Sequence, residues 1–281
     1  MRPPWAIKLL SPYPRYKKVA RRVVVECFGA SRPQQGRRAD EDAFLIRHGQ
    51  LPLAAVCDGA GHAQKVAKRV LIFFEKLFKE ASPRQVSKDR TWAGWIELLD
   101  SFMLGGAEST FVSVAVVNSI AVGACVGDSR AYFVNRDGDC QLITVGASKF
   151  RLGSGRAEAF AIRQPLASGE VLLLLSDVAR MSLGPCPLKT AVTSALARDF
   201  PDVPEAILQA AGRSGRADDM TAVALRVLSR PYWPPSFFLS FLSPLFTGPP
   251  TALRRYNRPN AQERTFCAAR VPLPQPKWPR D

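Results

Sequence analysis

The chain has 281 residues, a hydrophobic content of 47% and a formal net charge of +15. This length is enough for one large domain or two small ones. The six cysteines form no CxxC pair, which argues against a zinc site and against a disulfide framework. Only two histidines, His48 and His62, are present, which argues against a metal site built from histidines and against a serine–histidine triad.

The positive charge is concentrated at the two ends of the chain. Residues 1–22 hold seven Lys or Arg and no acid, and residues 229–281 hold eight against two acids. We therefore predict a basic, Pro-rich arm over 1–19, a folded domain over 20–228 and a Pro-rich, basic, partly apolar tail over 229–281. Nucleic acid or an anionic membrane would bind at these ends, and a solvated extension is the alternative. The N-terminus does not resemble a signal peptide, so we expect a cytoplasmic protein.

Hydrophobic patterning predicts a domain of strands interrupted by helices. Apolar, often β-branched runs predict strands at residues 22–29, 43–46, 53–57, 110–117, 120–126, 131–134, 171–175 and 220–227. Apolar residues at helical spacing predict helices at residues 63–79, 92–104, 188–197 and 204–211. Asn118-Ser119 predicts a hairpin turn between two of these strands. Residues 31–38 are expected to be a loop.

Acidic residues recur where these strands begin or end. They are Glu41 and Asp42 at a strand start, Asp58, Asp128 and Asp177 after apolar runs, and Asp218 before one. Strand ends can converge on one rim of a layered sheet, where unpaired carboxylates repel each other and a divalent cation relieves the repulsion. Ligation by oxygen alone suits Mg²⁺ or Mn²⁺ rather than zinc. The alternative is that each Asp only caps a turn, and for any one of them alone that interpretation is favoured.

Two such cations would support a particular class of reaction. A pair of ions about 3.5–4 Å apart can share a carboxylate and clamp an in-line displacement at phosphorus. An arginine nearby would bind two phosphate oxygens in bidentate fashion. The pattern therefore indicates metal-assisted hydrolysis of a phosphate ester, which needs neither a serine nor a histidine nucleophile.

Five stretches occur in series: RRADEDAF, VCDGAGHA, VGACVGDSRAYF, PLASGEVLLLLSD and GRADDMTAVALRV. Together they resemble the metal-dependent type 2C serine/threonine protein phosphatases in their bacterial form, over roughly residues 20–228. The resemblance implies an α+β fold, a four-layer α-β-β-α sandwich of two mainly antiparallel sheets flanked by helices. It also implies that the metals lie in a cleft at one end of the sandwich.

The resemblance also implies roles for individual residues. Asp58 is similar to the carboxylate that bridges two Mn²⁺ or Mg²⁺ ions, and the carbonyl of Gly59 is similar to a direct ligand. Asp177 and Asp218 match two further metal ligands, and Asp219 occupies a position that is often Asn. The remaining matches are Glu41 and Asp42 as holders of metal-bound waters, Arg37 as the phosphate-binding arginine with Arg38 as its competitor, and Asp128 as a ligand of a third metal.

The sequence departs from the family pattern near two of these ligands. The family's Ser-Asp-Gly is here Ser176-Asp177-Val178, and Met181 stands where another Asp is usual. A third metal site would therefore lack a ligand, and Asp128 would then be structural. The loop DGAGH is also shorter than the family's version, and we expect no role for His62 as a general acid, because it is offset from the position of the histidine in some members.

These observations predict a cytosolic enzyme that removes phosphate from Ser or Thr of phosphoproteins, in opposition to a Ser/Thr kinase. The altered segment SDVARM keeps a second hypothesis open, that of a degenerate phosphatase-like module that binds or regulates with little catalysis. Binding of Mn²⁺ separates these two hypotheses.

Overall fold

The computed structural model describes residues 22–33, 41–60, 65–177, 179, 183–213 and 218–230. Several residues of the sequence predictions lie outside these ranges: Arg37, Arg38, His62, Val178, Met181, the N-terminal arm and the tail beyond residue 230. All statements below concern the described residues.

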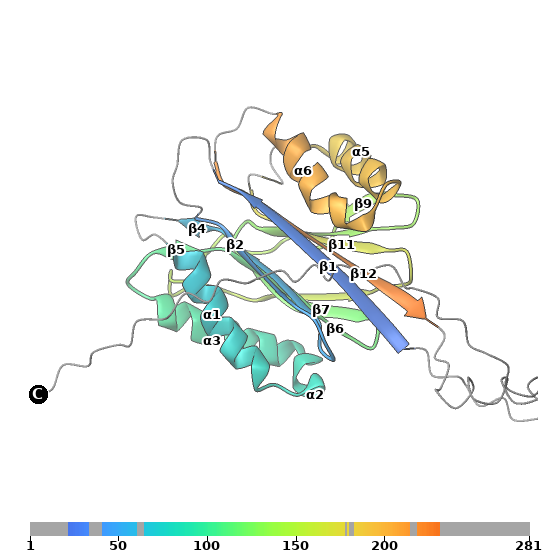
Figure 1. The fold of residues 1–281 in the computed structure, drawn as a ribbon. Coiled ribbons are helices and arrows are strands. Elements are labelled where there is room, and N and C mark those ends of the chain that lie inside the picture. The colour runs from blue at the N-terminus through green and yellow to red at the C-terminus, as the bar shows by residue number, and fades with distance from the viewer. Residues whose placement is uncertain are drawn as a thin grey trace, which may run out of the picture. The chain divides into compact units, whose positions relative to one another are not determined.

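Two five-stranded antiparallel sheets form the centre of the fold (Figure 1). Sheet A has the order β1 (Arg22–Arg32), β12 (Met220–Arg230), β11 (Val171–Leu175), β8 (Arg130–Val134) and β9 (Cys140–Leu142). Sheet B has the order β10 (Phe160–Pro165), β7 (Ile120–Val126), β6 (Phe111–Val117), β3 (Leu53–Cys57) and β2 (Ala43–Arg47). A small ribbon pairs β4 (Gly59–Ala60) with β5 (Glu108–Ser109).

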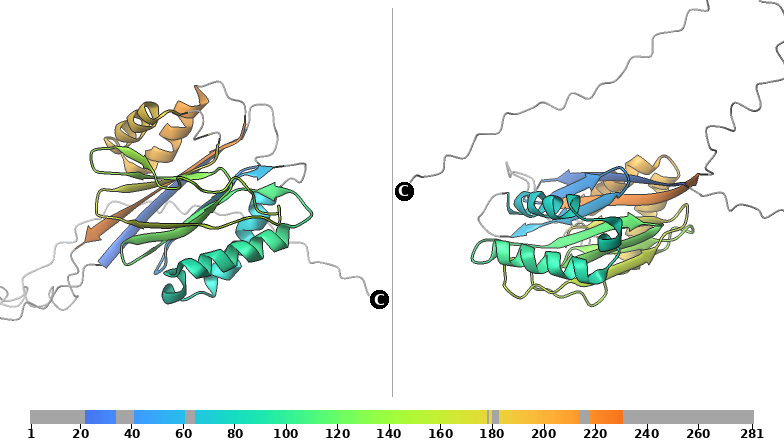
Figure 2. Two further views of the ribbon diagram at one scale, coloured as in Figure 1. Left: turned by 180° about the vertical axis from the view of Figure 1, so that it is seen from behind. Right: turned by 90° about the horizontal axis from the view of Figure 1, so that it is seen from below.

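Helices cover the outer face of each sheet (Figures 1 and 2). Sheet B is covered by α1 (Val66–Lys79), α2 (Pro83–Val86) and α3 (Asp89–Met103), and sheet A by α5 (Pro185–Leu196), a short 3-10 turn (Phe200–Asp202) and α6 (Val203–Gly212). The result is four layers in the order helix, sheet, sheet, helix. The predicted α-β-β-α sandwich is therefore confirmed.

Strand β11 shows how the layers are held together. Its five residues are all buried, because the strand lies in the middle of sheet A with apolar layers on both faces. Leu172 and Leu174 face the core between the sheets, whereas Leu173 and Leu175 face the helices. A continuous apolar run is the expected sequence of a strand that is buried on both sides.

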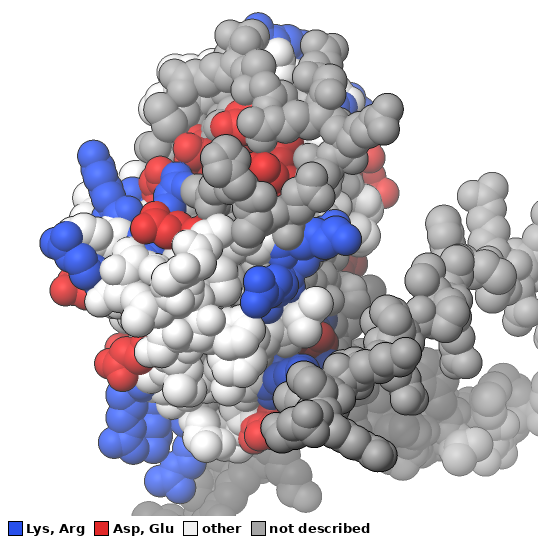
Figure 3. Space-filling model, turned by 90° about the vertical axis from the view of Figure 1, so that its left-hand side faces the viewer, with Lys and Arg blue, Asp and Glu red and all other residues white. Residues whose placement is uncertain are grey.

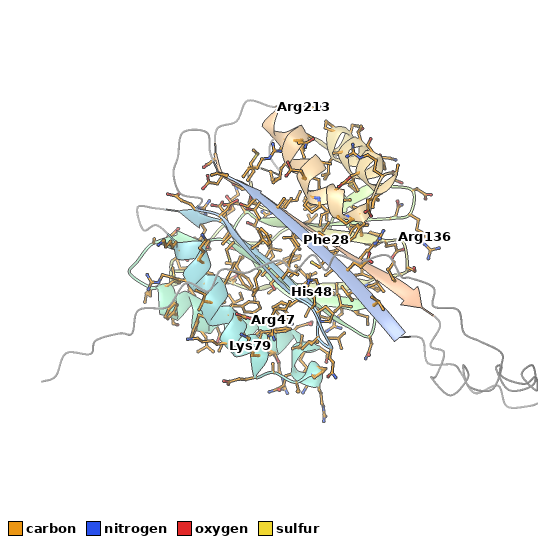
Figure 4. All side chains as sticks on the ribbon, viewed as in Figure 1. Phe28, Arg47, His48, Lys79, Arg136 and Arg213 are labelled. Atoms are coloured by element: carbon orange, nitrogen blue, oxygen red, sulfur yellow. The ribbon has the colours of Figure 1, made fainter. Side chains whose placement is uncertain are left out.

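The helical layers differ in composition. On sheet B, Phe74 of α1 is fully buried among the rings of Phe78, Trp92, Trp95 and Phe111. On sheet A the helical face is mostly aliphatic. Its aromatic contact joins Phe28 on β1, labelled in Figure 4, to Phe200, with ring centroids 5.7 Å apart in an edge-to-face arrangement.

The structure differs from the sequence predictions at several boundaries. Strand β1 continues through Ser31 and Arg32, which were expected to be in a loop, because both pair with the start of β12. The strands β4, β5, β9 and β10 and the helix α2 were not predicted. The predicted hairpin turn is confirmed: Asn118 and Ser119 both have positive φ, at 51° and 62°, which two-residue hairpin turns of type I′ require.

Cys27, Cys57 and Cys125 are buried free thiols, and burial raises the pKa of Cys27 and of Cys125 to about 12, which keeps them protonated. Among the described residues, no helix combines the length and the apolar character needed to cross a membrane.

Candidate metal centre

Strand register brings acids from both sheets to one end of the sandwich. In sheet B, Ala43 pairs with Cys57, so the start of β2 lies beside the end of β3. In sheet A, Leu175 pairs with both Arg130 and Ala222, so the end of β11 lies beside the starts of β8 and β12. The residues that precede or follow these pairs are Glu41, Asp42, Asp58, Asp128, Asp177, Asp218 and Asp219. Antiparallel pairing therefore gathers the predicted acids at one end of each sheet, and the stacking of the two sheets brings these ends to the same rim.

A network of hydroxyl groups fixes the backbone of Asp58. Its N–H donates to Thr110 Oγ1 at 2.9 Å, and its carbonyl accepts from the N–H of Thr110 at 2.9 Å and from Ser109 Oγ at 3.0 Å. Thr110 Oγ1 in turn contacts Ser129 Oγ at 2.7 Å. Because its backbone groups bond within the protein, the position of the Asp58 carboxylate is set before any ligand binds.

Gly59 begins the short ribbon directly after Asp58. A Cβ atom at this position would lie 3.0 Å from the carbonyl oxygen of Glu41, which is tighter than nearly all real Cβ contacts. Glycine therefore lets the chain after β3 approach the chain before β2 at the rim.

Asp177, Asp218 and Asp219 come from neighbouring strands of sheet A. Ser176 and Thr221 hold these strand ends together, since the N–H of Ser176 donates to the Thr221 carbonyl at 3.0 Å and the N–H of Thr221 donates to Ser176 Oγ at 2.9 Å. The buried Asp219 carboxylate accepts the backbone N–H of Glu41 at 2.5 Å. This bond links the acidic ends of the two sheets directly.

These acids line one small pocket of about 170 Å³. Its lining residues are Glu41, Asp58, Gly59, Arg151, Asp177, Asp218 and Asp219. The space-filling view of this end of the molecule shows acidic side chains gathered in one area (Figure 3). The predicted convergence of Asp58, Asp177 and Asp218 in one pocket is observed.

The electrostatics of the pocket follow from this crowding. Burial raises the pKa of Asp58 to about 7, with the negative charges of Asp177 and Asp128 adding to the effect and Arg151 opposing it. Single oxygens of Asp58, Asp128 and Asp177 all lie within 4.8 Å of one another. Without a cation, the rim therefore holds its carboxylates at an electrostatic cost.

The chemistry of the donors fits hard divalent cations. Apart from Gly59 and Arg151, the residues that line the pocket are acids, and no His or Cys is among them. Carboxylate and carbonyl oxygens suit Mn²⁺ and Mg²⁺, whose charge would offset both the burial and the neighbouring negative charges that raise the pKa of Asp58. Such ions are therefore the cofactor that this residue set fits.

Two predicted site residues lie at the margin of the pocket. Asp128 is in the turn that carries the chain from sheet B to sheet A, close to Asp58 and Asp177, and its carboxylate bonds to Arg151. Asp42 is buried to 2% exposure and lines a different pocket, with Ser31 and Lys68, on the other side of β2. Glu41, not Asp42, is therefore the member of the acidic pair that lines the pocket.

The two predicted arginines and the two histidines are not among the residues that line the pocket in the described part of the chain. Arg37, Arg38 and His62 lie outside the described residues. His48, labelled in Figure 4, follows β2 and so lies at the opposite end of that strand from Glu41.

Arg151 is the pocket residue that the sequence predictions missed. It belongs to the Gly-rich stretch between β9 and β10, and its Nη2 atom lies 3.3 Å from both carboxylate oxygens of Asp128. Burial disfavours its charge, but Asp128 and Asp58 outweigh that effect, so the pKa of Arg151 is raised. No local motif marks this residue, because its partner lies 23 positions earlier in the chain.

No protein-family model matches the sequence, and no curated protein matches it. Solved structures do match the fold, and several of them are bacterial serine/threonine phosphatases. The phosphatase of S. agalactiae superposes with a TM-score of 0.64 at 18% identity, covering 73% of this chain and 100% of the other. The catalytic domain of the phosphatase PstP, solved in complex with two manganese ions, gives 0.60 at 20% identity, covering 74% and 100%. Stp1 of Staphylococcus aureus gives 0.62 at 20%, covering 73% and 96%.

These similarities establish that the described domain has the fold of the bacterial serine/threonine phosphatases. The fold that the sequence motifs implied is thereby confirmed.

Proposed function

We propose that this chain hydrolyses phosphoserine and phosphothreonine on proteins with the help of two divalent cations, Mn²⁺ or Mg²⁺. The observation that carries the proposal is the acidic pocket at the sheet rim, lined by Asp58, Gly59, Asp177 and Asp218. It occurs in a fold whose solved examples include a serine/threonine phosphatase in complex with two manganese ions.

The residues proposed to hold the cations come from both sides of the sandwich. Asp58 follows β3 of sheet B, Gly59 begins the β4–β5 ribbon, and Asp177 and Asp218 come from strand ends of sheet A. These four residues would hold the cations, with Asp58 in the place of the bridging carboxylate that the family resemblance implies. The acidic pair Glu41 and Asp42 would hold metal-bound water, and of the two it is Glu41 that lines the pocket. Arg37 would bind the phosphate group of the substrate.

Bound cations would supply a Lewis acid for the phosphoryl oxygens and a water of lowered pKa as the nucleophile. The protein's part is to hold the carboxylates in place. The hydroxyl network around Thr110 fixes Asp58, and the 2.5 Å bond from Glu41 to Asp219 keeps the two strand ends together. Both contacts join protein groups to one another, so they hold the carboxylates in place independently of the cations.

The substrate class follows from the proposed chemistry. A phosphate monoester on a protein side chain is made by a kinase, so the proposed partners are a phosphoprotein and an opposing Ser/Thr kinase. Five of the seven described residues that line the pocket are acids, so a phosphate group would be held there through the cations. None of these described residues has a large apolar side chain that could select one peptide sequence over another.

The test is metal-dependent release of phosphate from phosphothreonine and phosphoserine peptides by the full chain. We expect turnover with Mn²⁺ or Mg²⁺ and none with chelator, and we expect Asp58→Asn to lower kcat/KM by roughly 10³-fold, equivalent to about 4 kcal/mol of transition-state stabilisation. Asp137→Asn, which changes an exposed acid in the β8–β9 turn, is the matched control and should leave turnover unchanged.

Two results would contradict the proposal. Metal-dependent turnover that survives in Asp58→Asn would show that the pocket is not the catalytic site. Failure of the wild-type chain to bind Mn²⁺ at millimolar concentration in calorimetry would favour a degenerate module that recognises phosphoproteins without hydrolysing them.

A further inference from the structure

The positively charged side chain of Arg151 lies among acids that could otherwise all serve as ligands of a metal ion. Its Nη2 atom lies 3.3 Å from both Oδ1 and Oδ2 of Asp128, and its side chain lines the acidic pocket together with Asp58 and Asp177. The side chains of Arg151 and Asp128 are 23% and 31% exposed, so water screens this pair less than it screens a surface ion pair.

The backbone around Arg151 is anchored at the rim. Leu152 and Ser109 exchange two backbone hydrogen bonds, of 2.8 and 3.1 Å, which attach the segment to β5. Ser154 Oγ donates to the carbonyl of Arg151 at 2.6 Å. These contacts set the place from which the guanidinium reaches Asp128.

A buried acid of α3 holds the following residues. The Asp100 carboxylate accepts the N–H groups of Gly153 at 2.6 Å, Gly155 at 3.2 Å and Ala157 at 3.2 Å. Gly153 has a φ of 93°, and a Cβ atom there would lie 3.1 Å from the Ala107 carbonyl oxygen, so the close approach of this segment requires glycine. The position of Arg151 is therefore built into the fold.

Asp128 can consequently be neutralised in two ways. Its oxygens lie near enough to those of Asp58 and Asp177 for the three to hold a metal ion. The guanidinium already contacts both of its oxygens, however, and a divalent ion at the same carboxylate would face a positive charge at short range. We therefore expect the guanidinium and a divalent ion to compete for the Asp128 carboxylate.

We propose that the guanidinium of Arg151 takes the place of a third metal ion beside Asp128. It neutralises the Asp128 carboxylate and keeps it from acting as a metal ligand. The pocket therefore binds two divalent ions rather than three. This inference rests on the proposed function, because it assumes that the pocket binds divalent cations. It assigns Asp128 and Arg151 a positioning role, and it leaves the cations to Asp58, Asp177 and Asp218.

The first experiment counts Mn²⁺ bound to the full chain by calorimetry and equilibrium dialysis. We expect two ions for the wild type and for Asp128→Asn, with dissociation constants equal within about twofold. Arg151→Gln frees Asp128 and should bind a third, weaker ion, whereas Arg151→Lys keeps the charge and should bind two. The double variant Arg151→Gln/Asp128→Asn should return to two.

The inference is overturned if Asp128→Asn loses an ion or binds Mn²⁺ tenfold more weakly, since Asp128 would then be a ligand. It is also overturned if the Mn²⁺ isotherm of Arg151→Gln is the same as that of the wild type.

The second experiment uses urea unfolding of the metal-free protein and so does not depend on bound ions. The two single variants and the double variant at Arg151 and Asp128 should show a coupling free energy, because each side chain loses its partner when the other is changed. The matched control is the exposed pair of Arg163 and Asp89, with Nη2 to Oδ1 at 2.8 Å, changed in the same way. Its coupling should be smaller, and Arg163→Gln should bind two Mn²⁺ ions.

The two experiments separate failure of this inference from failure of the proposed function. A wild type that binds two Mn²⁺ ions and hydrolyses phosphopeptides, with an unaltered isotherm in Arg151→Gln, refutes the inference alone. A wild type that binds no Mn²⁺ refutes the proposed function and, with it, the claim that Arg151 limits the number of ions.

Discussion

The aromatic layer under sheet B and the acidic rim of the sandwich are held together by opposite kinds of contact. In the aromatic layer, Phe74 is fully buried and its ring lies 4.8–6.1 Å from four others, so each side chain stabilises its neighbours. At the rim, carboxylates are held near one another by the strands beneath them, and their charges repel.

The comparison shows that the contacts that stabilise the fold and the residues proposed to bind cations lie in different regions of the domain. The aromatic layer needs no ligand, because its contacts are favourable in the free protein. The rim gains its favourable partner only from a cation, either the guanidinium of Arg151 or a bound metal ion. Substitutions in the two regions should therefore differ in sign as well as in size when the metal-free protein is unfolded.

The largest expected effect on stability comes from Phe74→Ala. Removing this ring leaves a cavity among Phe78, Trp92, Trp95 and Phe111, and we expect the free energy of unfolding to fall by about 3–5 kcal/mol. Urea unfolding of the metal-free protein measures this loss. Because Phe74 does not line the acidic pocket, Mn²⁺ should raise the stability of the variant and of the wild type by the same amount.

The matched control for that prediction is Ile72→Ala on the same helix. Ile72 is 58% exposed, so its truncation should cost less than about 1 kcal/mol. Equal losses in the two variants, or a lower Mn²⁺ affinity in Phe74→Ala, would mean that the aromatic layer and the rim are not independent.

The second prediction concerns the pH dependence of the metal-free protein. The pKa of Asp58 is raised from 3.8 to about 7 by burial and by Asp177 and Asp128, so the folded protein keeps a proton that the unfolded chain has released. Stability contributed by this group is complete below about pH 4 and is lost as the pH rises to about 7, with a slope of at most about 1.4 kcal/mol per pH unit.

Unfolding in urea between pH 4 and pH 8 with chelator present measures this slope. Asp58→Asn should flatten it, and Asp177→Asn should reduce it because it removes the neighbouring charge. Added Mn²⁺ should stabilise the protein more at pH 8 than at pH 5, since the ion binds the deprotonated carboxylate. If the free energy of unfolding of the metal-free wild type rises with pH over this range, the interpretation that the rim disfavours the charged form of Asp58 is wrong.

Much of the fold could be predicted from sequence because most of its strands have a strong local signal. The run Leu53–Cys57 and the run Val171–Leu175 are continuous apolar segments, and the structure has both as strands with the expected bounds. Strand β10 (Phe160–Pro165) was missed because it is an edge strand with alternating partial exposure and ends in a proline. Its place is set by pairing with β7, which no local pattern records.

The acidic pocket was predictable for a related reason. Asp58 and Asp177 each follow a buried strand, so local patterns place them at strand ends, and the stacking of the two sheets brings those ends together. Arg151 was not predictable, because it lies in a loop and meets Asp128 only through tertiary structure. Which of Glu41 and Asp42 lines the pocket could not be predicted either. Side chains of adjacent residues in an extended chain point to opposite sides, and the local pattern of two acids does not show which side faces the pocket.

The smallest expected effect comes from the residue that connects the two regions. Asp100 lies on α3, the helix of the aromatic layer, and its carboxylate binds three N–H groups of the segment that follows Arg151. In Asp100→Asn an amide group replaces one acceptor oxygen and faces those donors, so we expect a loss of about 1–3 kcal/mol. Hydrogen exchange should show faster amide exchange at Gly153, Gly155 and Ala157.

Glu97→Gln, an exposed change on the same helix, is the control and should alter neither stability nor exchange at these amides. If Asp100 positions Arg151, then Asp100→Asn should also shift the count of bound Mn²⁺ toward that of Arg151→Gln, because a loosened segment releases Asp128. Unchanged exchange at Gly153 would show that the Ser109–Leu152 bonds alone hold the segment, and that the aromatic layer and the rim are coupled only through the strands.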